Sequence, residues 1–212
     1  MKIEYSEVLI CYGDSNTYGF DPEPWSAGRY PEDSRWPELL GKSLGIDVVN
    51  AGENGREVPG TEDRIRGALK YLEGFSEQYA RRNVLLMLGS NDLLNGKTAS
   101  QTAARMEEFL RALRESIPAD RGALCLIAPP VMEYGTWVCR KQIYEESRRL
   151  EAAYAEAARK TDSGFIRTGD WRIPVASDSV HFTEEGHRKF AAQMLRAVRD
   201  LLKGSGKGGP YD

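Results

Sequence analysis

Residues 10–19 read ICYGDSNTYG, and at Gly13-Asp14 this stretch breaks an apolar run rich in β-forming residues. The run begins further back, so the pattern predicts a strand over Glu7–Tyr12. Ser15 follows the end of this strand, where a helix can begin. It is therefore either a helix-capping residue or a nucleophile held at the edge of a sheet.

The rest of the chain alternates short apolar runs with stretches of helical periodicity. Further strands are predicted at Ile46–Asn50, Asn83–Leu88, Ala123–Ala128 and Gly164–Arg167. Helices are predicted at Glu62–Leu72, Ala99–Ile117, Lys141–Lys160 and Glu184–Leu202, with Thr98 and Thr183 as caps. This alternation predicts an α/β fold, a three-layer α/β/α sandwich around a five-stranded parallel sheet. In such a sheet the reactive groups gather outside the carboxyl ends of the strands.

Length and charge narrow the class of protein. The chain has 212 residues, enough for one domain with a substantial core, which we expect over residues 1–202. The Gly-rich stretch 203–212, KGSGKGGPYD, is predicted to be a flexible tail. The 29 basic and 32 acidic residues give a net charge of −3. No basic face dominates, so we expect no nucleic-acid partner.

The cysteines and the N-terminal residues indicate where the protein works. Cys11 and Cys125 lie in apolar runs, which is typical of buried thiols and suits a reducing compartment. The acidic residues among the first thirteen do not fit a signal peptide. No segment approaches the roughly 20 apolar residues of a membrane span. We therefore expect a cytoplasmic protein with no membrane partner.

A serine nucleophile needs a base and a group that orients the base. The chain offers two histidines, His181 and His187. Asp178 precedes His181 by three residues, so its carboxylate can reach one ring nitrogen while the other faces outward. His187, in the sequence EEGHRKF, has no such partner and is expected on the flank of the last helix.

Acyl transfer also needs hydrogen-bond donors for the oxyanion that develops. Two segments after predicted strands carry glycines and asparagines: NAGENGR at 50–56 and LGSND at 88–92. A glycine lets a backbone N–H approach a ligand closely, and an asparagine side chain supplies a neutral donor. Taken alone, each segment is better explained as a turn, because glycine and asparagine are common turn residues.

Taken in order, four blocks resemble the SGNH hydrolase superfamily, also called GDSL-type esterases and lipases. The blocks are Gly13-Asp14-Ser15, Asn50–Gly55, Gly89–Asp92 and Asp178-x-x-His181. The resemblance covers nearly the whole chain and implies the flavodoxin-like fold of that superfamily. The longer segments GDSNTYGFDP, RYPEDSRWPELL and MLGSNDL are similar to sequences of its arylesterase and acyltransferase branch.

The resemblance implies a role for each residue of these blocks. Ser15 would be the nucleophile, His181 the base and then the acid, and Asp178 the carboxylate that orients it. The oxyanion hole would combine the Ser15 N–H, the Gly55 N–H and the Asn91 side chain, with Gly52 as a rival for the second donor. Asp14 would hold the nucleophile turn. No metal or organic cofactor is implied.

These roles predict a serine esterase or acyltransferase that acts on small short-acyl or aryl esters through an acyl-enzyme. The runner-up is a carbohydrate O-acetyl esterase, a deacetylase that uses the same site. A third hypothesis, from another class, is a non-catalytic binding module on this fold. The sequence leaves open whether water, another alcohol or a peroxide accepts the acyl group. A homo-oligomer is plausible by resemblance alone.

Two irregular stretches, 20–37 and 129–140, leave the ends of predicted strands and are rich in aromatic residues. Their aromatic residues are candidates for the walls of a substrate pocket: Trp25, Tyr30, Trp36, Tyr134 and Trp137. The alternative is that these side chains only fix long loops to the body of the protein.

Overall fold

Strand β1 (Glu7–Gly13) lies inside the sheet and pairs in parallel with two neighbours. These are β2 (Asp47–Gly52) and β3 (Arg81–Met87). Two further parallel strands, β4 (Leu124–Ile127) and β5 (Gly164–Ile166), complete the order β2-β1-β3-β4-β5. The computed structural model describes residues 7–23, 25–26 and 28–204. Within them, the predicted five-stranded parallel sheet is confirmed.

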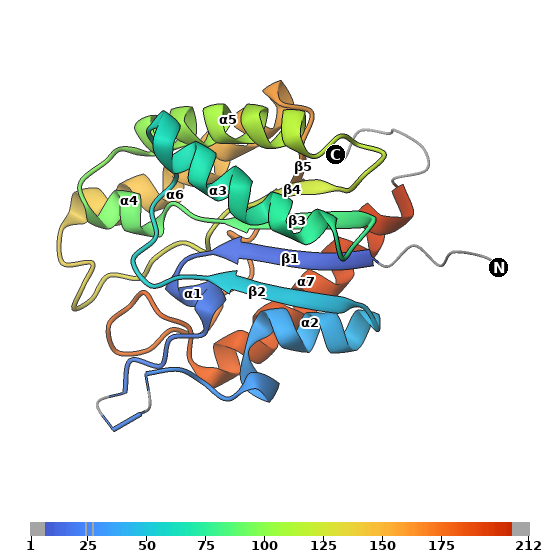
Figure 1. Cartoon of the computed structure of the whole chain (residues 1–212). Coiled ribbons are helices and arrows are strands. Elements are labelled where there is room, and N and C mark those ends of the chain that lie inside the picture. The colour runs from blue at the N-terminus through green and yellow to red at the C-terminus, as the bar shows by residue number, and fades with distance from the viewer. Residues whose placement is uncertain (1–6, 24, 27, 205–212) are drawn as a thin grey trace.

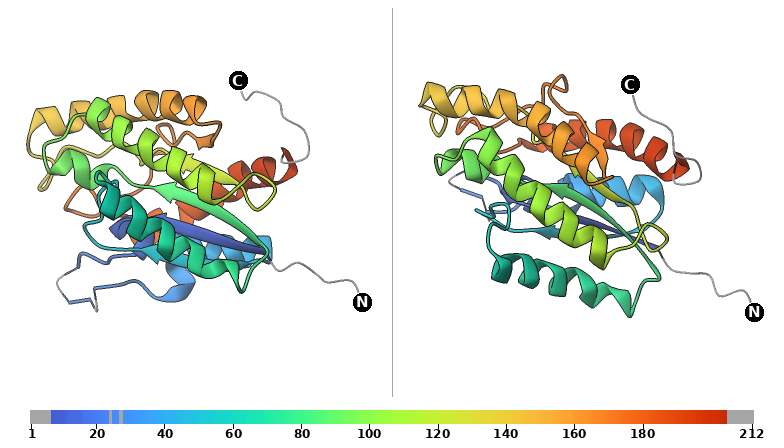
Figure 2. Two further views of the ribbon diagram at one scale, coloured as in Figure 1. Left: turned by 45° about the horizontal axis from the view of Figure 1, so that its top comes forward. Right: turned by 90° about the horizontal axis from the view of Figure 1, so that it is seen from above.

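Helices cover both faces of the sheet (Figures 1 and 2). One face carries α3 (Glu62–Glu73), α5 (Ala99–Ser116) and α6 (Lys141–Lys160). The other face carries α2 (Trp36–Leu44) and α7 (Glu184–Gly204). Successive β1 side chains enter the two cores in turn, Ile10 on the first face and Cys11 on the second. The predicted three-layer sandwich is confirmed.

The helix starts follow local capping chemistry. Thr98 and Gln101 form a reciprocal capping box at the start of α5. The Thr183 hydroxyl accepts a hydrogen bond from the Gly186 N–H at 3.0 Å, at the start of α7. Both predicted caps are therefore confirmed. Helix α2 was not predicted; it begins at Trp36, and Pro37 in its first turn fits because the N–H that proline lacks has no partner there.

The C-terminal helix extends beyond its predicted end. Helix α7 continues to Gly204, so the first two residues of the predicted tail are helical, and residues 205–212 lie outside the described part. The described residues also form two short 3₁₀ helices, η1 (Glu32–Ser34) and η2 (Gly74–Ser76). Across the described residues, no helix is both long and apolar enough to cross a membrane. Cys11 and Cys125 are buried free thiols, as predicted.

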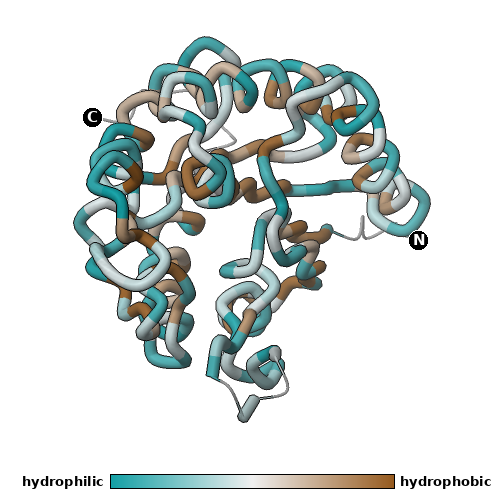
Figure 3. The backbone as a smooth tube through the Cα atoms, turned by 90° about the vertical axis from the view of Figure 1, so that its left-hand side faces the viewer, coloured by the Kyte–Doolittle hydropathy of each residue, from teal (hydrophilic) through white to brown (hydrophobic). Residues whose placement is uncertain are grey.

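The carboxyl ends of the strands all point to one edge of the sheet, at the left of Figure 1. Two short helices begin there, α1 (Ser15–Tyr18) after β1 and α4 (Ser90–Leu94) after β3. Figure 3 looks onto this edge, with apolar backbone in the interior and more polar segments around it. This edge is where the predicted site residues lie.

Candidate active site

The turn after β1 places Ser15 at the first position of α1, and the cap of that helix is Asp14. The Asp14 carboxylate accepts a hydrogen bond from the Asn16 N–H at 3.0 Å. Burial raises the pKa of Asp14 to about 6, against the opposing effects of that N–H and of nearby His181 and Arg56. The Ser15 side chain is not needed as a cap, which leaves its hydroxyl available for another partner.

That partner is His181. Its Nε2 lies 2.9 Å from the Ser15 Oγ, and its Nδ1 lies 2.6 Å from the Asp178 Oδ2. The other Asp178 oxygen accepts the backbone N–H groups of Val180 and His181, each at 2.9 Å. Burial works to raise the pKa of Asp178, but the hydrogen bonds from the His181 ring and from these two N–H groups outweigh it and lower the pKa below its ordinary value.

The charge on Asp178 fixes the tautomer of His181. An ionised carboxylate only accepts hydrogen bonds, so Nδ1 must carry the ring proton. Nε2 then presents a lone pair to the Ser15 hydroxyl. This arrangement can remove the serine proton and return it to a leaving group. The structure thus brings Ser15 to the Asp178–His181 pair, which lies more than 160 positions further along the sequence.

Asn16 ties the nucleophile turn to the segment that carries His181. Its side-chain amide donates to the Val180 carbonyl at 3.0 Å, and its side-chain oxygen accepts the Phe182 N–H at 2.9 Å. The two partners flank His181 directly. The Ser15–His181 distance is therefore held by two hydrogen bonds that neither residue makes itself. Sequence reasoning missed Asn16, although it stands next to the serine.

Asn91 reaches the same edge from β3. Gly89 turns the chain into α4 with a φ of 123°, and a Cβ there would lie 2.6 Å from the Tyr154 hydroxyl, so a side chain would not fit. The Asn91 Nδ2 donates to the Arg56 carbonyl at 3.0 Å. An amide nitrogen has two hydrogens, so one remains for a ligand.

The two glycines that compete as oxyanion donors differ in their bonding. The Gly52 N–H already donates to the Asn50 side-chain oxygen at 3.1 Å. Gly55, with a φ of 75°, lies in a turn closed by a hydrogen bond from the Arg56 N–H to the Glu53 carbonyl at 3.2 Å. Within the described residues, the Gly55 N–H has no acceptor. The bonding therefore favours Gly55 over Gly52 as the available donor.

The five aromatic residues predicted to line a pocket lie in different surroundings. The Trp137 ring is 5.2 Å from the His181 ring, in an edge contact. The Trp25 side chain is 95% exposed and lies in solvent. Tyr134 is also exposed, and its hydroxyl donates to the Cys139 carbonyl at 2.9 Å.

The other two predicted wall residues lie further inside. Trp36 is wholly buried, with its ring against Phe190 and its indole N–H donating to the Asn16 carbonyl at 3.0 Å. The prediction of Trp36 as a pocket wall is wrong, because its indole belongs to the core. Through its hydrogen bond to Asn16, the indole supports α1. The Tyr30 ring packs on His187, at 5.3 Å between centroids.

Phe20, which sequence reasoning did not select, lies beside the candidate base. Its ring centroid is 4.7 Å from that of His181. Together with Trp137, it places aromatic surface on the imidazole that contacts Ser15. The signal in the sequence was its position just after the nucleophile helix. Among the described residues, no three His, Cys, Asp or Glu side chains come together as a metal site.

The comparison with protein families decides the class of this protein. The model of the GDSL-like Lipase/Acylhydrolase family matches residues 11–189. The chain belongs to this family. It is therefore a carboxylic ester hydrolase, and the predicted family and enzyme class are confirmed. A search of curated proteins with this sequence finds no significant match.

Solved structures of esterases share the fold. The native aryl esterase of M. smegmatis is 20% identical with a TM-score of 0.77, over 93% of this chain and 100% of the other. A protein from Agrobacterium tumefaciens that is assigned as an arylesterase is 24% identical with a TM-score of 0.75, over 92% and 100%. Est24, a carbohydrate acetylesterase from Sinorhizobium meliloti, is 22% identical with a TM-score of 0.75, over 92% and 100%. At these identities the likeness extends to the fold alone.

Proposed function

We propose that this hydrolase cleaves small carboxylic esters with short acyl or aryl groups, using Ser15, His181 and Asp178 as a catalytic triad. The observation that carries the proposal is the imidazole of His181, which lies within hydrogen-bond distance of both the Ser15 hydroxyl and the Asp178 carboxylate. A non-catalytic binding module has no need of such an arrangement.

In the proposed reaction, the Ser15 oxygen attacks the ester carbonyl carbon while His181 takes up the serine proton. The carbonyl oxygen becomes an oxyanion, which the N–H groups of Ser15 and Gly55 and the Asn91 amide stabilise. As this tetrahedral intermediate collapses, the bond to the alcohol breaks and protonated His181 gives its proton to the departing oxygen. His181 then takes a proton from water as the water oxygen attacks the acyl-enzyme carbonyl. When this second tetrahedral intermediate collapses, the acyl–Ser15 bond breaks, the acid leaves, and protonated His181 gives its proton to the Ser15 oxygen.

The burial of the reacting groups supports small substrates. Ser15 is 6% exposed and His181 is 4% exposed, so a substrate must enter a recessed site to reach them. The aromatic rings of Phe20 and Trp137 stand beside the imidazole and narrow the approach further. Short acyl groups fit such an entrance better than long chains.

A direct test is the Ser15→Ala variant with p-nitrophenyl acetate as substrate. We expect turnover to fall to a residual rate about 10³–10⁴-fold above water, because binding and the oxyanion hole remain while the nucleophile is lost. A fluorophosphonate probe should label the wild type and leave the variant unlabelled. Turnover in the variant at the wild-type rate, or equal labelling, would move the nucleophile to another residue.

A carbohydrate O-acetyl esterase is the second candidate function. It is favoured by the named structural neighbours, which include carbohydrate acetylesterases as well as aryl esterases. Acetylated sugars and p-nitrophenyl acetate, compared at matched enzyme concentration, separate the two. A kcat/KM that is higher on the sugars would favour the second function, with the same triad. The same assays with an added alcohol or peroxide test acyl transfer.

We also propose a cytoplasmic location. Cys11 and Cys125 are buried and unpaired, and Cys139 is an exposed free thiol. Free thiols are typical of a reducing compartment. Fractionation of cells that express the protein, followed by detection of the chain in each fraction, tests this proposal.

A further inference from the structure

The proposed oxyanion hole draws its donors from three separate segments of the chain. Ser15 follows β1, Gly55 follows β2 and Asn91 follows β3. Such donors stabilise an oxyanion only when their mutual positions are fixed before the reaction, and a misplacement of about 1 Å can cost about 10²-fold in rate. Gly55 lies in an exposed loop, so its position in particular needs a support.

The residue next to Gly55 supplies this support. The Arg56 guanidinium donates from Nη1 to the Gly13 carbonyl at 2.8 Å and also to the Ala51 carbonyl. Gly13 is the last residue of β1, two positions before Ser15, and Ala51 lies in β2. One side chain therefore joins the carboxyl ends of the two strands that carry the first and second donors.

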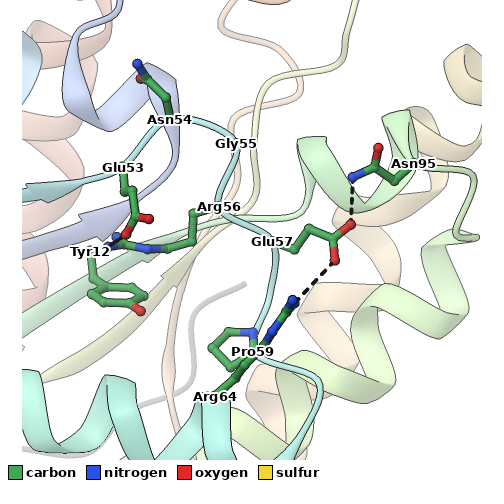
Figure 4. Close-up of a pocket in the computed structure, with 9 residues that line it drawn as sticks. All are labelled: Tyr12, Glu53, Asn54, Gly55, Arg56, Glu57, Pro59, Arg64 and Asn95. Atoms are coloured by element: carbon green, nitrogen blue, oxygen red, sulfur yellow. Dashed lines mark hydrogen bonds and ion pairs between the residues drawn. The ribbon is translucent and has the colours of Figure 1, made fainter.

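Two further contacts hold the guanidinium in place. Its Nη2 pairs with the Glu53 carboxylate at 2.6 Å, and its central carbon lies 4.1 Å from the centroid of the Tyr12 ring. Figure 4 shows the Arg56 side chain turned back over Tyr12 and toward Glu53. The planar guanidinium can meet carbonyls, a carboxylate and a ring face at once, whereas a lysine ammonium cannot reproduce this set.

The backbone of Arg56 reaches the third donor. Its carbonyl accepts the Asn91 Nδ2 at 3.0 Å, which orients the side-chain amide. Its N–H closes the turn that contains Gly55 by donating to the Glu53 carbonyl at 3.2 Å. Two residues on, the Val58 N–H donates to the buried Asp92 carboxylate at 2.9 Å and ties the same loop to α4 a second time.

We infer that Arg56 is a positioning residue that assembles the oxyanion hole by joining the segments that bear Ser15, Gly55 and Asn91. This inference rests on the proposed function. Arg56 itself need not touch the substrate, since its guanidinium is occupied by protein acceptors. It acts on the transition state by fixing where the three donors lie.

The test compares Arg56→Ala with Arg64→Ala on p-nitrophenyl acetate. Figure 4 draws a pocket that both Arg56 and Arg64 line. The Arg64 side chain is 66% exposed, and its guanidinium lies 3.8 Å from the Glu57 carboxylate. We expect Arg56→Ala to lower kcat about 10- to 10²-fold with little change in KM. Arg64→Ala should stay within about twofold of the wild type, because exposed ion pairs contribute little.

Four measurements separate positioning from a general loss of structure. Arg56→Lys should remain impaired, and guanidinium ion added at millimolar concentration should restore part of the Arg56→Ala rate. A trifluoromethyl ketone, which Ser15 would convert to a tetrahedral oxyanion, should bind Arg56→Ala more weakly by the same factor as the loss in kcat. Arg56→Ala should also cost less in an Asn91→Ala background, because the two residues act on one hydrogen-bond system.

The results that overturn the inference are distinct from those that overturn the proposed function. A loss confined to KM, full activity of Arg56→Lys, or additive effects with Asn91→Ala would remove the positioning role. If Arg56→Ala unfolds, the Arg56→Lys kinetics and the double-mutant cycle built on Arg56→Lys decide the matter in the same way. Ester turnover at the wild-type rate in Ser15→Ala would instead count against the triad, whatever Arg56 does.

Discussion

His181 and His187 are six residues apart, and both are buried, yet their surroundings are opposite. Both ring nitrogens of His181 have partners, Ser15 on one side and Asp178 on the other. Neither ring nitrogen of His187 has a hydrogen-bond partner among the described residues, and its ring makes edge contacts with those of Tyr30 and Phe182. Burial is common to the two residues, so it does not mark a catalytic histidine.

The difference arises from where each histidine stands in the fold. His181 lies in a loop at the carboxyl edge of the sheet, where the backbone N–H groups around it are bound by Asp178. His187 lies in the first turns of α7, on the side that faces the core. Its burial lowers its pKa to about 3, and Arg35 acts in the same direction. It is thus a neutral core residue under ordinary conditions.

The largest expected effect is the loss of activity when the side chain of His181, rather than that of His187, is removed. His181→Ala should lower kcat by on the order of 10⁵- to 10⁶-fold, as loss of the base does in a serine hydrolase triad. His187→Ala, the matched control, should keep most of kcat because its ring touches no proposed catalytic group. Steady-state kinetics with p-nitrophenyl acetate, at matched folding by circular dichroism, measure both. Comparable losses in the two variants would mean that the Asp178–His181 pair has been misread.

The sequence allowed the pair to be predicted because its geometry is local. Asp178 lies three positions before His181 within one turn, so their contact needs no knowledge of the rest of the fold. The strands and the caps Thr98 and Thr183 were predicted for the same reason. Where a contact joins near neighbours in the sequence, the local pattern was sufficient to predict it.

Contacts between segments far apart in the sequence could not be predicted from local patterns. Trp36 belongs to the core because α2 lies against α7, a contact between segments about 150 residues apart that no local pattern reveals. Arg56 binds carbonyls on two different strands, so its place could not be read from the turn alone. Gly52 and Gly55 were both candidate donors in the sequence. In the structure the Gly52 N–H already has an acceptor, whereas Gly55 lies in a turn with a φ of 75°.

The next largest expected effect is on the free energy of unfolding at acid pH, and it arises from His187. An unfolded histidine titrates near pH 6.5, whereas folded His187 stays neutral down to about pH 3. Between these values the unfolded chain binds a proton that the folded chain excludes, so the free energy of unfolding falls as the pH falls. At pH 5 this effect amounts to about 2 kcal/mol.

His187→Leu should remove that loss. The charged groups that bear on the ring, Arg35, Glu184 and His181, remain in the variant. Asp14 acts with the opposite sign, because its raised pKa lets the folded chain take up a proton as the pH falls below about 6. It is present in both proteins, so it cancels in the difference. Urea unfolding at pH 7 and pH 5 measures the difference, and an equal drop in both proteins would contradict the assigned environment.

The smallest expected effect concerns Trp137, the aromatic residue beside His181, and tests whether its ring limits the size of the acyl group. The Trp137 backbone N–H donates to the Asp178 carbonyl at 3.2 Å, so the loop stays attached when the side chain is removed. The ring, half of it exposed, stands beside the His181 imidazole, where it would limit the size of an acyl group.

The wild type should prefer acetyl and butyryl esters to lauryl esters of p-nitrophenol. Trp137→Ala should raise kcat/KM for octanoyl relative to acetyl esters about three- to tenfold, since one methylene in a pocket is worth about tenfold or more. Tyr134→Ala, in the same loop but packed on Tyr144 instead, should leave the ratio unchanged. The same shift in both variants would mean that loop mobility, rather than the Trp137 ring, sets the preference.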